Sequence, residues 1–122
     1  MRQKLAFGII AFWIAFGLVL DFLMGTKQSI YLADPVRRET WRLAHAHGTL
    51  LMLVYVAYSK LHGISVEAHD NLMFFGAILM PVGFLLGGIG ATETDPSPAV
   101  LLVPVGGFSF VLGLVLSLRK QR

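Results

Sequence analysis

The sequence predicts an all-α fold, a polytopic transmembrane four-helix bundle in up-down-up-down order that forms one integral membrane domain over residues 1–122. The first observation is composition: 56% of the residues are hydrophobic, only 14% are charged, and the mean hydropathy is +0.71. A water-soluble domain of this length has too little interior to bury so much apolar surface. The second observation is that the apolar residues form long runs separated by short polar clusters. These runs predict helices near residues 5–25, 35–61, 71–91 and 98–118.

The first apolar run follows Arg2 and Lys4, which resemble the basic start of a signal peptide. The run is longer than the apolar region of a typical signal peptide, and no Ala-x-Ala-like cleavage site follows it. We therefore expect a retained transmembrane helix over 5–25.

The other helix starts carry capping signals. Asp34 precedes Pro35, so an aspartate that can accept a free backbone N–H is followed by a proline at the first helical position. Ser97 and Pro98 repeat this pattern, and Asp70 is expected to cap the helix over 71–91. Small residues spaced four apart, among them Gly83, Gly87, Ser109 and Gly113, predict close packing between the third and fourth helices.

Basic residues predict the orientation in the bilayer. Arg and Lys residues number six on the side of the two termini and four on the other, and the loop around Glu93 has no base. The positive-inside rule then favours an inner-membrane protein with both termini in the cytoplasm. The net charge of +3 arises from bases at the ends of apolar runs, which argues for the lipid bilayer as partner and against nucleic acid. Other membrane subunits, or a second copy of the chain, are further possible partners.

Ionisable residues gather on one side of the membrane in this topology. Asp21 near the end of the first helix, and His45 and His47 near the start of the second, should lie at similar depth. We expect the Asp21 carboxylate to approach one imidazole, with Arg42 and Glu93 as supporting residues around the site. Ionisable side chains at such depth are costly, which makes them candidates for function.

His45 and His47 are two residues apart, which is about 200° of rotation on a helix, so they should point to nearly opposite faces. Both cannot bind one metal ion from a regular helix. We expect the histidine that faces the bundle core to be functional, and its neighbour to face headgroups or water. His45 and His47 are the candidate cofactor ligands, and Asp21 is a third candidate metal ligand or a partner for the second ring nitrogen.

The segment Trp41 to Leu51, with its His-x-His, resembles a helix of subunit I of the heme–copper oxidases, and also short bacterial membrane proteins with such a pair. In the oxidases the pair serves two hemes on opposite faces of one helix. The resemblance implies heme or copper as the cofactor. The chain is far shorter than the oxidase subunit, and His62 and His69 belong to the opposite membrane side, so a complete heme–copper centre is excluded.

Three function classes follow. The first is a small membrane protein that binds heme or a metal ion through His45 or His47 and is linked to electron transfer or oxidase assembly. The second is a non-catalytic membrane subunit with structural histidines, and the third is a transporter or proton-relay component. The absence of cysteine excludes disulfides and iron–sulfur clusters, and no hydrolase or phosphate-binding motif is present. Whether the chain is an enzyme is left open.

Overall fold

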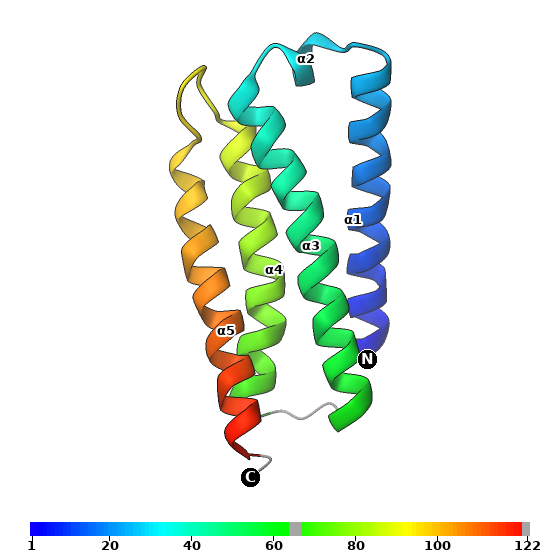
Figure 1. Cartoon of the computed structure of the whole chain (residues 1–122), viewed down its shortest axis with the longest axis vertical. Helices are drawn as coiled ribbons and strands as arrows, with labels where there is room; N and C mark the ends of the chain where they lie inside the picture. Colours follow the sequence, from blue (N-terminus) through cyan, green and yellow to red (C-terminus); the bar gives the residue numbers. More distant parts are fainter. Residues whose placement is uncertain (64–66, 121–122) are drawn as a thin grey trace.

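The computed structural model describes residues 1–63 and 67–120, and this part of the chain is helical without any β-strand. The predicted all-α class is confirmed. The elements, in chain order, are α1 (Arg2–Gly25), α2 (Ser29–Leu32), α3 (Pro35–His62), α4 (Ala68–Ile89), the 3-10 helix η1 (Pro98–Leu101) and α5 (Leu102–Lys120). The four long helices alternate in direction, and the start of α1 and the end of α5 lie at the same end of the molecule (Figure 1).

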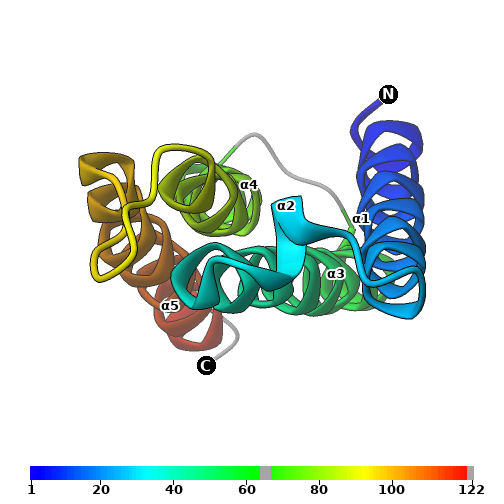
Figure 2. The same cartoon turned by 90° about the horizontal axis from the view of Figure 1, so that it is seen from above.

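The long helices pack in an open row, each against the next along the chain. α3 lies between α1 and α4, and α5 packs on the far side of α4 (Figure 2). Within residues 1–63 and 67–120 the backbone of α1 contacts neither α4 nor α5. α3 and α4 are therefore the inner helices. The buried core includes residues from all four long helices: Ala6, Ile10, Met52, Tyr55, Val56, Met73, Phe74, Ala77 and Phe110.

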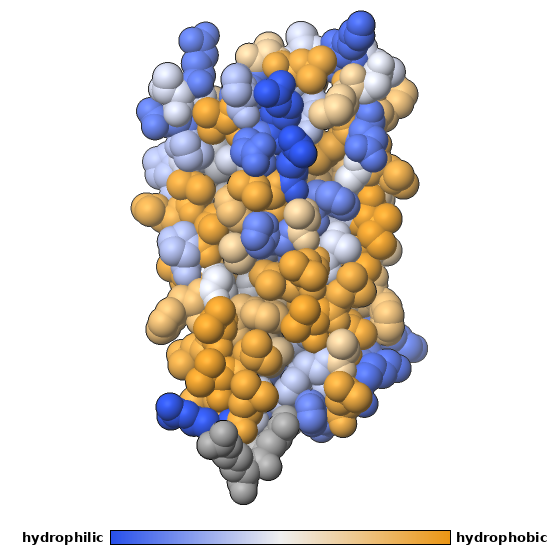
Figure 3. Space-filling model, viewed as in Figure 1, coloured by the Kyte–Doolittle hydropathy of each residue, from blue (hydrophilic) through white to orange (hydrophobic). Residues whose placement is uncertain are grey.

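Three helical segments are long and apolar enough to cross a membrane, namely α1, α4 and the segment Pro98–Arg119, which runs through η1 and α5 as far as Arg119. α3 has 28 residues, but its charged first two turns and its two histidines make it less apolar than the other three. In Figure 3 a largely hydrophobic area covers the lower half of the face above its lower end, and hydrophilic residues gather at both ends and extend from the upper end to about the middle. A broad exposed apolar surface of this kind marks contact with a membrane or a partner.

The helix starts agree with the sequence in one case and differ in another. The Asp34 side chain accepts a hydrogen bond from the Arg37 backbone N–H at 3.0 Å, which confirms the predicted cap. The predicted Asp70 cap is wrong. α4 begins at Ala68, and the Asp70 carboxylate is fully buried in its first turn, where Arg2 pairs with it. Asp70 therefore binds the Arg2 cation of α1 instead of capping the start of α4.

The close packing of α4 against α5 is confirmed at several glycines. A Cβ atom at Gly76 would lie 2.6 Å from the Phe110 nitrogen, and one at Gly106 would lie 2.4 Å from the Met80 nitrogen. One at Gly83 would lie 2.9 Å from the backbone nitrogen of α5 residue 103. These distances leave no space for a side chain, so the two backbones are in direct contact.

Candidate functional site

His45 projects from α3 into a notch on α1. A Cβ atom at Gly17 would lie 2.3 Å from the His45 Cε1 atom, so the imidazole occupies the space that the missing side chain leaves. The ring nitrogen Nδ1 is 2.7 Å from the Trp13 carbonyl oxygen. Because a carbonyl can only accept, Nδ1 carries the proton in this hydrogen bond. In the neutral ring Nε2 then holds the free lone pair.

In a second contact of this kind, α1 supplies the ring and α3 supplies the glycine. The Trp13 indole, 3% exposed, lies over Gly48 of α3, where a Cβ atom would come within 2.5 Å of the indole carbons. α1 and α3 therefore each insert a ring into a glycine notch of the other. These two contacts hold the His45 imidazole in place relative to α1.

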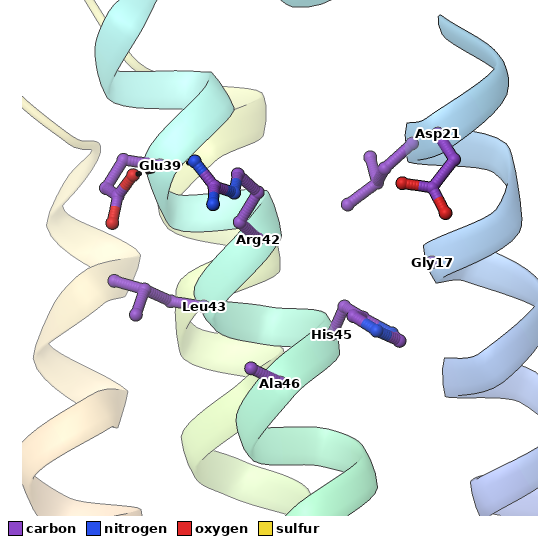
Figure 4. A pocket seen from close by; sticks show the side chains of 8 residues that line it. Gly17, Asp21, Glu39, Arg42, Leu43, His45 and Ala46 are labelled. Carbon is purple, nitrogen blue, oxygen red and sulfur yellow. Dashed lines mark ion pairs between the residues drawn. The ribbon is translucent and has the colours of Figure 1, made fainter. Parts of the chain in front are cut away.

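A pocket of about 320 Å³ lies between α1 and α3 at this point. Figure 4 shows the His45 ring directed toward α1, with Asp21 on α1 above Gly17 and with Arg42 and Glu39 on α3 above the ring. The exposed residues Asp21, Glu39 and Arg42 form the charged rim of the pocket, and less exposed apolar residues form its floor. The pocket is lined by Gly17, Leu20, Asp21, Glu39, Arg42, Leu43, His45 and Ala46.

The structure thus brings Asp21 and His45 to one pocket, although they are 24 positions apart in the chain. The expected bond from the imidazole to the carboxylate is not formed. Trp13, rather than Asp21, accepts the Nδ1 proton. Within the described part of the chain Asp21 makes no hydrogen bond or ion pair, and it is exposed at the rim. Asp21 is thus a charged group of the pocket that no described residue neutralises by an ion pair.

His47 points to the other side of α3, as the two-residue spacing predicts. Its Nδ1 lies 2.9 Å from the Leu43 carbonyl oxygen, and its ring packs on Phe84 of α4 with 5.2 Å between ring centroids. The expectation that the second histidine faces headgroups or water is wrong, because α3 is an inner helix with neighbours on both sides. The two histidines therefore serve different interfaces.

The two residues expected to support the site separate in the structure. Arg42 lines the pocket and forms an ion pair with Glu39 at 3.9 Å. Glu93 is exposed in the loop after α4 and is not among the described residues that line the pocket. Glu39 was missed by the sequence reasoning. Its spacing of three from Arg42, on the helix that carries the histidines, is the signal that could have found it.

The described residues contain no group of three or more histidine, cysteine, aspartate or glutamate side chains that could hold a metal ion. The three candidate ligands do not converge, since Asp21 and His45 line one pocket and His47 faces α4, as the two-residue spacing of the histidines predicts. A metal site built from several side chains of this set is therefore not supported. Heme ligation through one imidazole nitrogen does not need such a group and stays a prediction.

Tyr31 of α2 lies beside the charged rim. The residue is 1% exposed, and its ring stacks on that of Trp41, with 6.3 Å between the ring centroids. Burial raises the pKa of the Tyr31 hydroxyl, Arg42 and Arg38 oppose the shift, and Asp21 and Glu39 add to it. The charged pocket residues Asp21, Glu39 and Arg42 thus also influence the pKa of the Tyr31 hydroxyl in α2.

Comparisons with protein-family models, with curated proteins and with solved structures found no match to this chain.

The arrangement limits what the pocket can do. The Nε2 lone pair can accept one hydrogen bond, one proton or one coordination bond. The imidazole cannot turn freely, because Trp13 and Gly17 hold it. The site is thus suited to a ligand that presents one donor to one imidazole nitrogen.

Proposed function

We propose that this chain is a small integral membrane protein whose His45 pocket binds one lipid-soluble molecule with a hydroxyl-bearing ring, of the phenol or quinol class. The hydroxyl would donate to Nε2 of His45. Asp21 at the rim would exchange the proton with water. The single observation that carries the proposal is the hydrogen bond between His45 and Trp13, which leaves Nε2 as the acceptor.

Four membrane spans are part of the proposal. Three segments are long and apolar enough to cross. α1 and α4 run in the same direction (Figure 1), so a chain in which both cross must return through α3 between them. At 1.5 Å per residue the 28 residues of α3 extend about 42 Å, enough for a bilayer core of about 30 Å. The Lys and Arg distribution supports cytoplasmic termini in an inner membrane.

The depth of the pocket supports a lipid-soluble ligand. His45 lies ten residues after Pro35, about 15 Å along α3, whereas Arg42 lies about 10 Å along it. In the four-span arrangement the imidazole is inside the apolar layer and the charged rim is near the surface. A ligand that enters from the bilayer would place its ring on Leu20, Leu43 and Ala46 and its hydroxyl on His45.

The volume of the pocket favours a small ring over a porphyrin. About 320 Å³ is at the lower end of the range for small-molecule pockets. It suits a one-ring headgroup better than a macrocycle. The sequence predicts heme or copper. The pocket volume supports the quinol class over heme, and the lack of a metal-binding group among the described residues supports it over copper.

Binding of decylubiquinol to the purified protein in lipid nanodiscs tests this function. We expect saturable binding, and weaker binding of decylubiquinone, because the quinone has no hydroxyl to donate to Nε2. His45→Phe keeps a ring of similar size and should reduce quinol affinity about tenfold, as one lost hydrogen bond predicts. His47→Phe, two residues away on the opposite face, is the matched control and should change affinity less than twofold.

A second candidate, a non-catalytic membrane subunit with structural histidines, is favoured by the contacts of His47. That ring bonds within its own helix and packs on Phe84. If the unmodified protein binds neither quinol nor quinone, or if His45→Phe and His47→Phe bind equally well, this second function is the better one.

A further inference from the structure

A second polar cluster lies at the other end of the molecule, where the Arg2 side chain at the start of α1 reaches the start of α4. Both helix starts are at the lower end of the molecule in Figure 1. The Arg2 Nη1 atom donates to Asp70 Oδ2 at 2.6 Å, and Nη2 donates to the Asn71 side-chain oxygen. The Arg2 guanidinium carbon also lies 5.5 Å from the centre of the Phe74 ring. A carboxylate, an amide oxygen and an aromatic face thus surround one planar cation.

Asp70 is the centre of this cluster. Its side chain is 0% exposed, and the Tyr55 hydroxyl donates to the same Oδ2 atom at 3.4 Å. The other oxygen, Oδ1, is buried and has no hydrogen-bond partner in the part of the chain that the structure describes. A buried carboxylate oxygen without a donor is unfavourable. Asp70 therefore has unused capacity to bind a donor.

We propose that Asp70, Asn71, Tyr55 and Phe74 form a binding site for a small organic cation of the guanidinium class, and that Arg2 is its built-in occupant. A free guanidinium group can present two parallel N–H donors to both oxygens of one carboxylate. Its flat face can also lie against an aromatic ring. Such a ligand would reach Oδ1, to which Arg2 does not donate. The site is separate from the His45 pocket and does not depend on it.

Access to this site runs past Arg2. The Arg2 side chain is 28% exposed, whereas the Asp70 side chain beneath it is fully buried. Arg2 belongs to the first turn of α1, beside an exposed Met1. Removing the Arg2 side chain would open a path to Asp70 without changing a residue of the proposed site.

Binding of methylguanidinium to an Arg2→Ala variant tests the proposal. Lys4→Ala is the matched control, because it removes one exposed positive charge from the same end of α1. Binding is measured by equilibrium dialysis of the purified protein in nanodiscs, and the melting temperature is followed in parallel at constant chloride concentration. We expect saturable binding to Arg2→Ala that raises its melting temperature. The Lys4→Ala variant and the unmodified protein should bind at least about tenfold more weakly, because the tethered Arg2 competes at high effective concentration.

The double variant Arg2→Ala with Asp70→Asn should lose the binding, since the carboxylate is its main acceptor. Equal binding to the single and the double variant would overturn the proposal, and so would the absence of saturable binding to Arg2→Ala. Either result would leave Arg2 and Asp70 as a structural ion pair only.

Arg2→Ala is also informative if it does not fold alone. Extraction in the presence of methylguanidinium chloride should then recover folded protein with the tryptophan emission of the unmodified chain. Extraction in sodium chloride at the same chloride concentration should not recover it. If methylguanidinium also fails to recover it, the proposal is wrong. A third variant, Tyr55→Phe, keeps the ring and removes one donor to Oδ2. Combined with Arg2→Ala it should weaken binding less than Asp70→Asn does, because the carboxylate that accepts the guanidinium N–H groups remains. Binding as weak as that of the Arg2→Ala and Asp70→Asn double variant would contradict the assignment of Asp70 as the main acceptor.

Discussion

Replacing Gly17 by alanine tests the packing that positions His45. The new Cβ atom would lie 2.3 Å from Cε1, 2.6 Å from Nδ1 and 2.8 Å from Nε2 of the imidazole. Ordinary contacts between such atoms are about 3.5 Å or more, so the ring has to move by roughly 1 Å. A shift of that size breaks the hydrogen bond to the Trp13 carbonyl.

The expected loss of stability follows from three contributions. Overpacking typically costs about 1–3 kcal/mol. A lost hydrogen bond adds about 1 kcal/mol, and the better helix propensity of alanine returns about 1 kcal/mol. The variant should therefore be less stable by about 1–3 kcal/mol. Reversible unfolding in mixed micelles, followed by tryptophan fluorescence, measures this difference.

Gly8→Ala on the same helix is the matched control. Among the described residues no heavy atom lies within 4 Å of a Cβ atom at Gly8, so the change should be neutral or slightly stabilising. In a His45→Ala background the clash at Gly17 disappears, and Gly17→Ala should then resemble Gly8→Ala. The coupling between the two sites should be at least about 1 kcal/mol. If Gly17→Ala changes the stability of the unmodified protein no more than Gly8→Ala does, the His45 ring does not fill the notch at Gly17.

Three further predictions concern the end caps and the topology. The raised pKa of Tyr31 means that the folded state holds the phenolic proton more tightly than the unfolded state, whose pKa is near 10.0. Stability should thus be complete below that pH and fall as the pH rises through the higher folded value, and Tyr31→Phe should remove this fall in an unfolding series at alkaline pH. Asp34→Ala removes the acceptor for a backbone N–H at the start of α3 and should lower stability by about 1 kcal/mol, whereas Asp34→Ser should retain most of it in the same assay. The chain has no cysteine, so Lys60→Cys and Asp95→Cys provide single labelling sites, and a membrane-impermeant maleimide should modify them from opposite sides of the membrane. Labelling of both from one side would exclude four spans.

Local patterns in the sequence predicted the start of α3 and the divergence of its histidines. Both depend on neighbours within a few residues: an aspartate before a proline, and a spacing of two on a helix. Close packing of α4 on α5 was likewise readable from small residues spaced four apart.

Which helices lie side by side could not be predicted from such local patterns. His47 was expected to face headgroups or water, and it packs on Phe84 because α3 has a helix on each side. Asp70 was expected to cap a helix, and it binds Arg2 from 68 positions away. No periodicity within a helix encodes which other helix becomes its neighbour, so both errors arise from long-range contacts.

The paired notches between α1 and α3 have a mechanical consequence. With Trp13 seated on Gly48 and His45 seated on Gly17, α1 cannot slide along α3 by small steps, because each ring would meet a side chain on the next turn. The two ring contacts therefore fix the axial position of α1 against α3 near Gly17. Arg2 lies 15 residues before Gly17, about 22 Å along the same helix. Any axial displacement of α1 large enough to withdraw Arg2 from Asp70 must also move Gly17 from beneath the imidazole. The contact of Arg2 with Asp70 and the seat of His45 on Gly17 thus share one helix, although the residues of the two sites are different.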